Sequence, residues 1–145
     1  MRSMHRESTD IQSSICLRLI SVWGQIKSNI EQYATGNNLT LPQIFLLHSL
    51  YVQDNILMGT LAKHLHCDAS NVTGIVDRLE SAGLIYRQAL PEDRRAKQLT
   101  ISPRGKAMIE GLIPLLASNT RLGCLDGADL TNLQRILSKV TDQPQ

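Results

Sequence analysis

The sequence lacks the features that mark membrane and exported proteins. No apolar run in its 145 residues approaches the length needed to span a bilayer. The first nine residues, MRSMHREST, have no apolar core of the kind that defines a signal peptide. We therefore expect a soluble, cytoplasmic protein.

The sequence also lacks the residue sets that enzymes use. It has no glycine-rich phosphate-binding loop, no metal-ligating set and no nucleophile with a recognisable base. His64 and His66 lie near Cys67, but residues two apart on a helix point to different sides and do not converge on a metal. We therefore expect no enzyme activity, no metal site and no cofactor.

Cysteine is scarce. Cys16, Cys67 and Cys124 are an odd number without metal-ligand spacing. This usage fits a reducing compartment better than a disulfide framework. Cys67 lies between two predicted helices, where we expect a core position.

A strong net charge is absent, so bulk charge says little about partners. The formal net charge is only +2, but residues 86–106 hold six basic residues against two acidic ones. The basic residues are Arg87, Arg94, Arg95, Lys97, Arg104 and Lys106, and the acidic ones are Glu92 and Asp93. Such a cluster can follow phosphates while the whole protein stays near neutral. A hairpin with ordinary surface charges is the alternative, which charge alone does not exclude.

Apolar periodicity predicts long helices at both ends of the chain. The first is expected over about residues 9–34, with a heptad-like apolar seam from Ile11 to Tyr33. The last carries a second seam from Leu130 to Val140. A long helix with such a seam needs a helical partner, and a second copy of the chain is the simplest one.

Two short helices followed by a hairpin are predicted in the middle of the chain. The expected elements are helices over 58–66 and 69–81 and strands over 84–88 and 97–101. The hairpin tip carries Asp93, Arg94 and Arg95, and Ser102 can cap a further helix with Pro103 at its first position. This order is that of a helix-turn-helix with a basic β-wing, which holds DNA by its grooves and backbone.

The helix over 69–81 has short polar side chains where a recognition helix meets base edges. Its apolar stripe runs through Val72, Val76 and Leu79, which leaves the other face polar. The candidates for DNA contact there are Ser70, Asn71, Thr73, Gly74 and Arg78. Ser, Asn and Thr are also common near helix starts. The place of this helix within the helix-turn-helix therefore decides the interpretation in favour of DNA.

The central motifs resemble those of the MarR family of bacterial transcription regulators. The matching residues are Asp77-Arg78-Leu79-Glu80, Gly83-Leu84, Asp93-Arg94-Arg95 and Ile101-Ser102-Pro103-Arg104-Gly105. The resemblance implies a mainly α fold with a small β-wing. Residues 37–102 would form the winged helix-turn-helix core, flanked by dimerisation helices over 1–36 and 103–145. It also implies a homodimer that places one recognition helix per subunit in double-stranded DNA.

The same resemblance implies roles for the wing residues. Arg95 would enter the minor groove and Asp93 would hold its guanidinium, an arrangement that suits a narrow, electronegative groove. Arg94 and Lys97 would meet phosphates. Gly74 departs from the family pattern, because many members carry a larger polar or basic residue there. Glycine at that position costs the helix about 1 kcal/mol relative to alanine.

The leading hypothesis is a dimeric regulator, in this family usually a repressor, that a small molecule releases from a pseudo-palindromic operator. By resemblance, the effector is a small aromatic or amphipathic compound bound between the dimerisation helices and the winged domain. The candidate lining residues are Cys16, Trp23, Phe45, His48 and Tyr51. For His48 we favour the alternative of a packed histidine.

Two other functions remain open for the same chain. Cys16 is placed like the peroxide-reactive cysteine of the organic-hydroperoxide-sensing branch of the family, and Cys124 lies near the position of a second cysteine that some of its members use. That branch surrounds its cysteine with tyrosines, whereas Ile20, Ile30 and Leu41 are expected here, and apolar surroundings keep a thiol unreactive. We therefore favour a small hydrophobic residue at a helix interface. A helical interaction protein without DNA binding is the last alternative, disfavoured by the basic wing.

Overall fold

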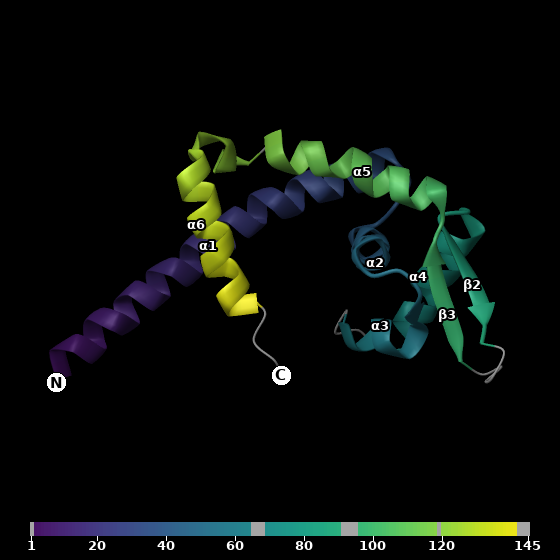
Figure 1. Ribbon diagram of the computed structural model, residues 1–145, viewed down its shortest axis with the longest axis horizontal. Coiled ribbons are helices and arrows are strands. Elements are labelled where there is room, and N and C mark those ends of the chain that lie inside the picture. Colours follow the sequence, from purple (N-terminus) through teal and green to yellow (C-terminus); the bar gives the residue numbers. More distant parts are fainter. Residues whose placement is uncertain (1, 65–68, 91–95, 119, 142–145) are drawn as a thin grey trace. The chain divides into compact units, whose positions relative to one another are not determined.

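The computed structural model of the chain is mainly helical with a small antiparallel sheet (Figure 1). It describes residues 2–64, 69–90, 96–118 and 120–141, and only the backbone of residues 2–8, 62–64, 69 and 70. The elements are α1 (Arg2–Gly36), α2 (Leu41–Val52), β1 (Ile56–Leu57), α3 (Met58–His64), α4 (Ala69–Ser81), β2 (Ile85–Ala89), β3 (Lys97–Ile101), α5 (Pro103–Ser118), the 3-10 helix η1 (Arg121–Cys124) and α6 (Gly127–Thr141). The predicted fold class is confirmed. Among the described residues, no helix combines the length and apolar character needed to cross a membrane.

The chain divides into two compact units, and each is described by itself. The larger contains residues 28–114, and the smaller contains residues 1–27 and 115–145. The sequence-based boundaries are 1–36, 37–102 and 103–145. The observed division differs, because the end of α1 and most of α5 belong with the winged helix-turn-helix.

Side-chain packing explains why the end of α1 belongs to the larger unit. Ile30 and Ala34 are buried in it. The Tyr33 hydroxyl donates a hydrogen bond to the Met108 carbonyl of α5, at 2.8 Å. Burial raises the pKa of Tyr33 above its ordinary value of 10.0. The helix pair α1 and α5 therefore contributes to the same core as the helix-turn-helix.

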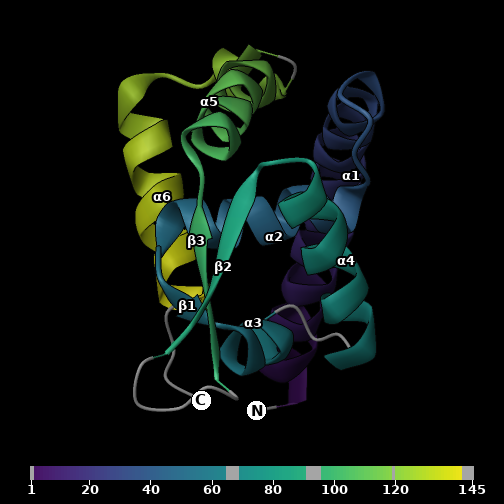
Figure 2. The same ribbon diagram turned by 90° about the vertical axis from the view of Figure 1, so that its right-hand side faces the viewer.

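Three helices and the sheet enclose that core (Figure 2). Helix α2 contacts α4 and β3, while α4 also contacts α3 and β2. The largest fully buried side chains are Ile44, Leu46, Leu47, Leu50, Leu61, Val72, Val76, Leu79, Leu84, Ile85, Leu99 and Ile109. Because α4 contributes three of these, its orientation is fixed by the core.

The sheet has three strands in the order β1–β3–β2. Strands β2 and β3 form the predicted hairpin, with Ile85 opposite Ile101. The prediction missed β1, which pairs with β3 and places Ile56 opposite Leu99. A strand of two residues is too short to produce a recognisable alternation of apolar and polar residues.

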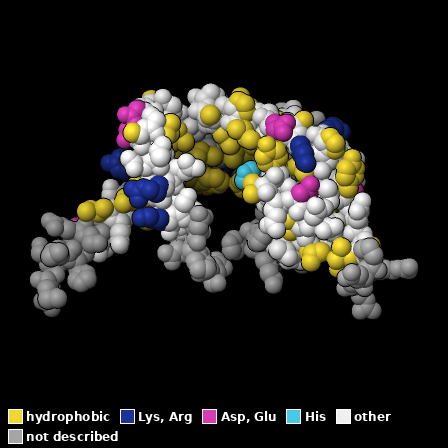
Figure 3. Space-filling model, viewed as in Figure 1, with side chains coloured by type: hydrophobic (Ala, Val, Ile, Leu, Met, Phe, Trp, Pro, Cys, Tyr) yellow, Lys and Arg dark blue, Asp and Glu magenta, His cyan; other side chains and the backbone are white. Residues whose placement is uncertain are grey.

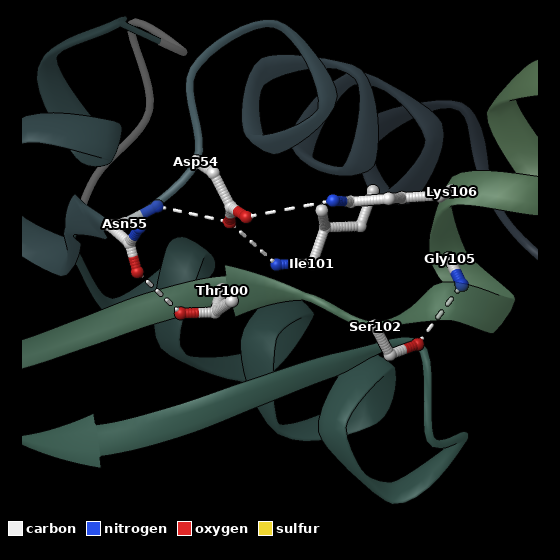
Figure 4. A network of polar contacts seen from close by, with 7 residues as sticks. All are labelled: Asp54, Asn55, Thr100, Ile101, Ser102, Gly105 and Lys106. Carbon is white, nitrogen blue, oxygen red and sulfur yellow. Dashed lines mark hydrogen bonds and ion pairs between the residues drawn. The ribbon is translucent and has the colours of Figure 1, made fainter.

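A polar network fastens the end of α2 to β3 and α5 (Figure 4). The Asp54 carboxylate accepts the backbone N–H groups of Asn55 and Ile101, both at 3.0 Å. It also lies 3.9 Å from the Lys106 ammonium. The Thr100 hydroxyl donates to the Asn55 side chain at 3.0 Å. Asn55 has a φ of 61°, in the left-handed region that asparagine tolerates, so the chain turns sharply here into β1.

Candidate nucleic-acid interface

The outward face of α4 is the first part of the candidate interface. Its apolar stripe is buried in the core, so the opposite side faces solvent. Asn71, Gly74 and Arg78 are exposed, and Thr73 is half-buried. Spacings of three and four residues bring the three exposed positions to one side of the helix. The side chain of Ser70 lies outside the described residues.

The turn that follows α4 is held by the start of α5. The Ser102 hydroxyl donates to the Gly83 carbonyl at 2.8 Å, and the Ser102 amide donates to the Leu84 carbonyl at 3.0 Å. Ser102 Oγ accepts the Gly105 amide at 3.0 Å, which confirms Ser102 as the helix cap (Figure 4). A Cβ atom at Gly105 would lie 2.2 Å from the Leu84 carbonyl oxygen. The end of the recognition helix and the start of α5 are thus joined directly.

Two basic residues of the expected phosphate-following cluster are engaged within the protein. The Arg104 guanidinium donates to the Ala82 carbonyl at 2.8 Å. The Lys106 ammonium lies 3.9 Å from Asp54. Both residues hold elements together, so the positive charge available to DNA is smaller than the sequence indicates.

Arg87 is a third such residue, and it joins β2 to α4. Its Nη2 donates a hydrogen bond to the Asp77 carboxylate, and its Nε lies 3.2 Å from Glu80 Oε2. The Nε contact is an ion pair without hydrogen-bond geometry. Sequence reasoning missed this role. The signal available was the pair of acidic residues three apart on one helix, which share a face.

The wing supplies the remaining candidates. Lys97 is half-buried at the start of β3, and neither Lys97 nor Arg78 has an ion-pair partner in the part of the chain that the structure describes. The predicted wing-tip residues Asp93, Arg94 and Arg95 lie outside the described residues, so their roles stay predictions.

The five candidate effector residues fall in both units. Phe45, His48 and Tyr51 lie on α2 in the larger unit, and Cys16 and Trp23 lie on α1 in the smaller one. His48 is exposed, so the packed interpretation is wrong. The reason is that His48 lies beside the buried stripe of α2 and not within it. A shared pocket stays a prediction.

The smaller unit leaves its apolar side chains uncovered. All the buried hydrophobic residues belong to the larger unit, as far as the described residues go. Ile15, Leu19 and Trp23 are 50%, 47% and 45% exposed, and hydrophobic side chains are visible on the surface along α1 (Figure 3). Cys16 and Cys124 are free and exposed. The expected aliphatic enclosure of Cys16 is therefore not formed within one protomer.

Comparison with known proteins agrees with this architecture. The MarR family profile matches residues 39–97. The organic hydroperoxide resistance transcriptional regulator of Bacillus subtilis is 22% identical over 127 residues, which are 88% of this chain and 86% of that protein. The structure of Bordetella bronchiseptica BpsR, whose DNA binding is regulated by 6-hydroxynicotinic acid, is 24% identical, with a TM-score of 0.68 over 88% of this chain and 98% of that one. S. aureus MepR bound to an oligodeoxyribonucleotide is 24% identical, with a TM-score of 0.63 over 90% and 96%. The chain is a transcriptional regulator of the MarR family.

Proposed function

We propose that this regulator binds a specific DNA sequence as a homodimer and represses transcription until a small molecule releases it. The observation that carries the proposal is the polar outward face of α4, held in place by a fully buried apolar stripe. A rigid helix with such a face is the element that enters the major groove in helix-turn-helix proteins. Two proteins of similar fold, BpsR and MepR, bind DNA.

A second copy of the chain completes the smaller unit in this proposal. The exposed apolar residues of α1 are matched on α6 by Leu130, Ile136 and Leu137, which are 42%, 50% and 39% exposed. Burying apolar surface yields about 25 cal/mol per Å². A two-fold dimer would present two α4 helices to half-sites roughly 34 Å apart, and the operator would be pseudo-palindromic.

The wing would hold the flanks of each half-site. By family resemblance, Arg95 enters the minor groove with Asp93 fixing its guanidinium, while Arg94 and Lys97 meet phosphates. Removing one such phosphate interaction lowers the slope of log affinity against log salt by about 0.9. Ser70, Asn71, Thr73, Gly74 and Arg78 would meet the major groove.

Release would follow from a shift between two spacings of the recognition helices. An effector acts in this way only when it binds the DNA-incompetent spacing more tightly than the competent one. A small aromatic or amphipathic compound would contact Cys16, Trp23, Phe45, His48 and Tyr51.

Selection from a random DNA pool tests the proposal. We expect the purified protein to enrich an inverted repeat and to bind it with a Kd of about 10⁻⁸ M or tighter, at least roughly 10³-fold below a scrambled duplex. Arg78→Ala should weaken binding by about tenfold. Arg121→Ala removes an exposed arginine of the smaller unit and is the matched control. Equal affinity for selected and scrambled duplexes would refute sequence-specific binding.

A peroxide sensor is the second candidate. It is favoured by the exposed thiol of Cys16 and by the similarity to the organic hydroperoxide resistance regulator. We rank it second because the residues near Cys16 in the sequence are largely aliphatic. We expect low doses of an organic hydroperoxide to leave DNA binding of the wild type nearly unchanged. Rapid release that Cys16→Ser abolishes, with a Cys16–Cys124 crosslink on non-reducing electrophoresis, would reverse this ranking.

A further inference from the structure

We propose that Arg87 is a positioning residue for DNA binding, which locks the wing strand β2 onto the recognition helix α4 and does not itself contact DNA. This inference rests on the DNA-binding function proposed above. It assigns Asp77 and Glu80 as the two anchors on α4. The wing and the recognition helix would then meet DNA as one rigid body.

The contacts of Arg87 support a locking role. Its guanidinium meets Asp77 and Glu80, which share one face of α4. Its side chain is 21% exposed, against 57% for Asp77 and 42% for Glu80. A planar guanidinium with several donors can engage two carboxylates together, which a lysine ammonium does less well.

The place of Arg87 along β2 explains why the lock matters. Ile85 is buried, whereas Gln88 and Ala89 beyond Arg87 are exposed. Arg87 is therefore the outermost residue of β2 that is held against α4 in the described chain. Beyond it, β2 pairs only with β3, which places Gln88 opposite Gln98. Without the ion pairs, this outer part of the hairpin would be free to change its angle to α4.

The same geometry argues against a phosphate contact. Two carboxylates surround the guanidinium, so its charge is already compensated where it lies. A phosphate approaching Arg87 would also approach Asp77 and Glu80, and like charges repel. Arg78 and Lys97 have no such acidic partner among the described residues and remain suited to the DNA backbone.

A charge-conserving double variant separates positioning from direct contact. Asp77→Asn with Arg87→Gln removes the main ion pair without changing the net charge. We expect affinity for the selected operator to fall about tenfold, because the lock is absent from both subunits. The salt slope should stay at the wild-type value, because every phosphate interaction is retained. Lys97→Gln is the matched control, and its slope should fall by about 0.9 for each phosphate interaction that the substitution removes.

A reversed pair provides the second arm. Glu80→Arg with Arg87→Glu restores an ion pair between α4 and β2 with opposite polarity. We expect it to recover most of the affinity that is missing in Arg87→Glu alone. A direct phosphate contact at position 87 predicts no recovery, because glutamate repels phosphate. Circular dichroism and thermal melting confirm that each variant is folded at the assay temperature.

Each outcome bears on the inference. A salt slope that falls in the charge-conserving variant as it does in Lys97→Gln makes Arg87 a phosphate contact and overturns the positioning role. Wild-type affinity in that variant, or no recovery in the reversed pair, overturns it as well. If the wild type enriches no DNA sequence, the proposed function fails first, and the inference fails with it.

Discussion

At the scale of single residues, glycines of one unit have opposite reasons for their identity. Gly105 sits against backbone, because a Cβ atom there would lie 2.2 Å from the Leu84 carbonyl oxygen and 2.8 Å from Ile101. Gly74 lies in the exposed face of α4, where an added Cβ would meet nothing within 4 Å. The fold therefore requires one glycine and is indifferent to the other.

Gly105→Ala should destabilise the protein by about 2 kcal/mol, in the range of overpacking a close contact. Gly74→Ala is the matched control and should raise stability by up to about 1 kcal/mol, because alanine favours the helix. Urea unfolding of both variants measures these changes. Equal effects of the two substitutions would show that the close approach at Leu84 does not matter.

At the scale of elements, the joint between α1 and α5 rests on one tyrosine and one glycine. The Tyr33 hydroxyl reaches the Met108 carbonyl at 2.8 Å. A Cβ atom at Gly111 would lie 2.8 Å from that hydroxyl but 3.8 Å from the ring carbon that bears it. The hydroxyl, and not the ring, therefore requires glycine at this position.

Tyr33→Phe should lower the free energy of unfolding by about 1 kcal/mol, because the hydrogen bond to Met108 is removed. Gly111→Ala should stabilise the Tyr33→Phe background by up to about 1 kcal/mol, because the alanine methyl then fits and favours the helix. In the wild-type background the same change displaces the hydroxyl and should stabilise less or not at all. Chemical denaturation of the four proteins gives the cycle, and strict additivity would contradict the contact.

The pH dependence of this joint follows from the raised pKa of Tyr33, whose cause is burial. The folded state keeps the phenol proton to higher pH than the unfolded chain does. Its contribution is therefore fully present below the ordinary pKa of 10.0 and is lost as pH rises through the folded value. The stability difference between wild type and Tyr33→Phe should be constant from neutral pH to about pH 9 and shrink at higher pH. Denaturation curves across this range test it, and a difference that grows with pH would contradict the assignment.

At the scale of the whole molecule, apolar burial is unevenly divided between the two units. The larger unit contains every buried hydrophobic residue of the described chain, whereas α1 exposes Ile15 at 50% and α6 exposes Ile136 at 50%. A single chain thus leaves its smaller unit without a core. Dimerisation through the terminal helices is the arrangement that we propose to supply one.

Ile15→Glu combined with Ile136→Glu should convert a dimer at micromolar concentration into a monomer, because each charge would have to be buried unpaired. Val52→Glu is the control, since Val52 is 71% exposed at the end of α2 in the larger unit. Analytical ultracentrifugation distinguishes the two states. A wild type that sediments as a stable monomer would remove the dimer proposal.

The sequence by itself determined the order of the elements, the recognition helix over Ala69–Ser81 and the Ser102 cap, because apolar periodicity and capping residues act within a few positions. Only the tertiary structure decided where the charges of the hairpin go. Arg87 looked available to DNA in the sequence, yet folding brings it to acidic residues of α4. The pairing of β1, the exposure of His48 and the boundary between the units were decided in the same way. The physical reason is that partners distant in sequence become neighbours only when the elements pack, and no local pattern records them.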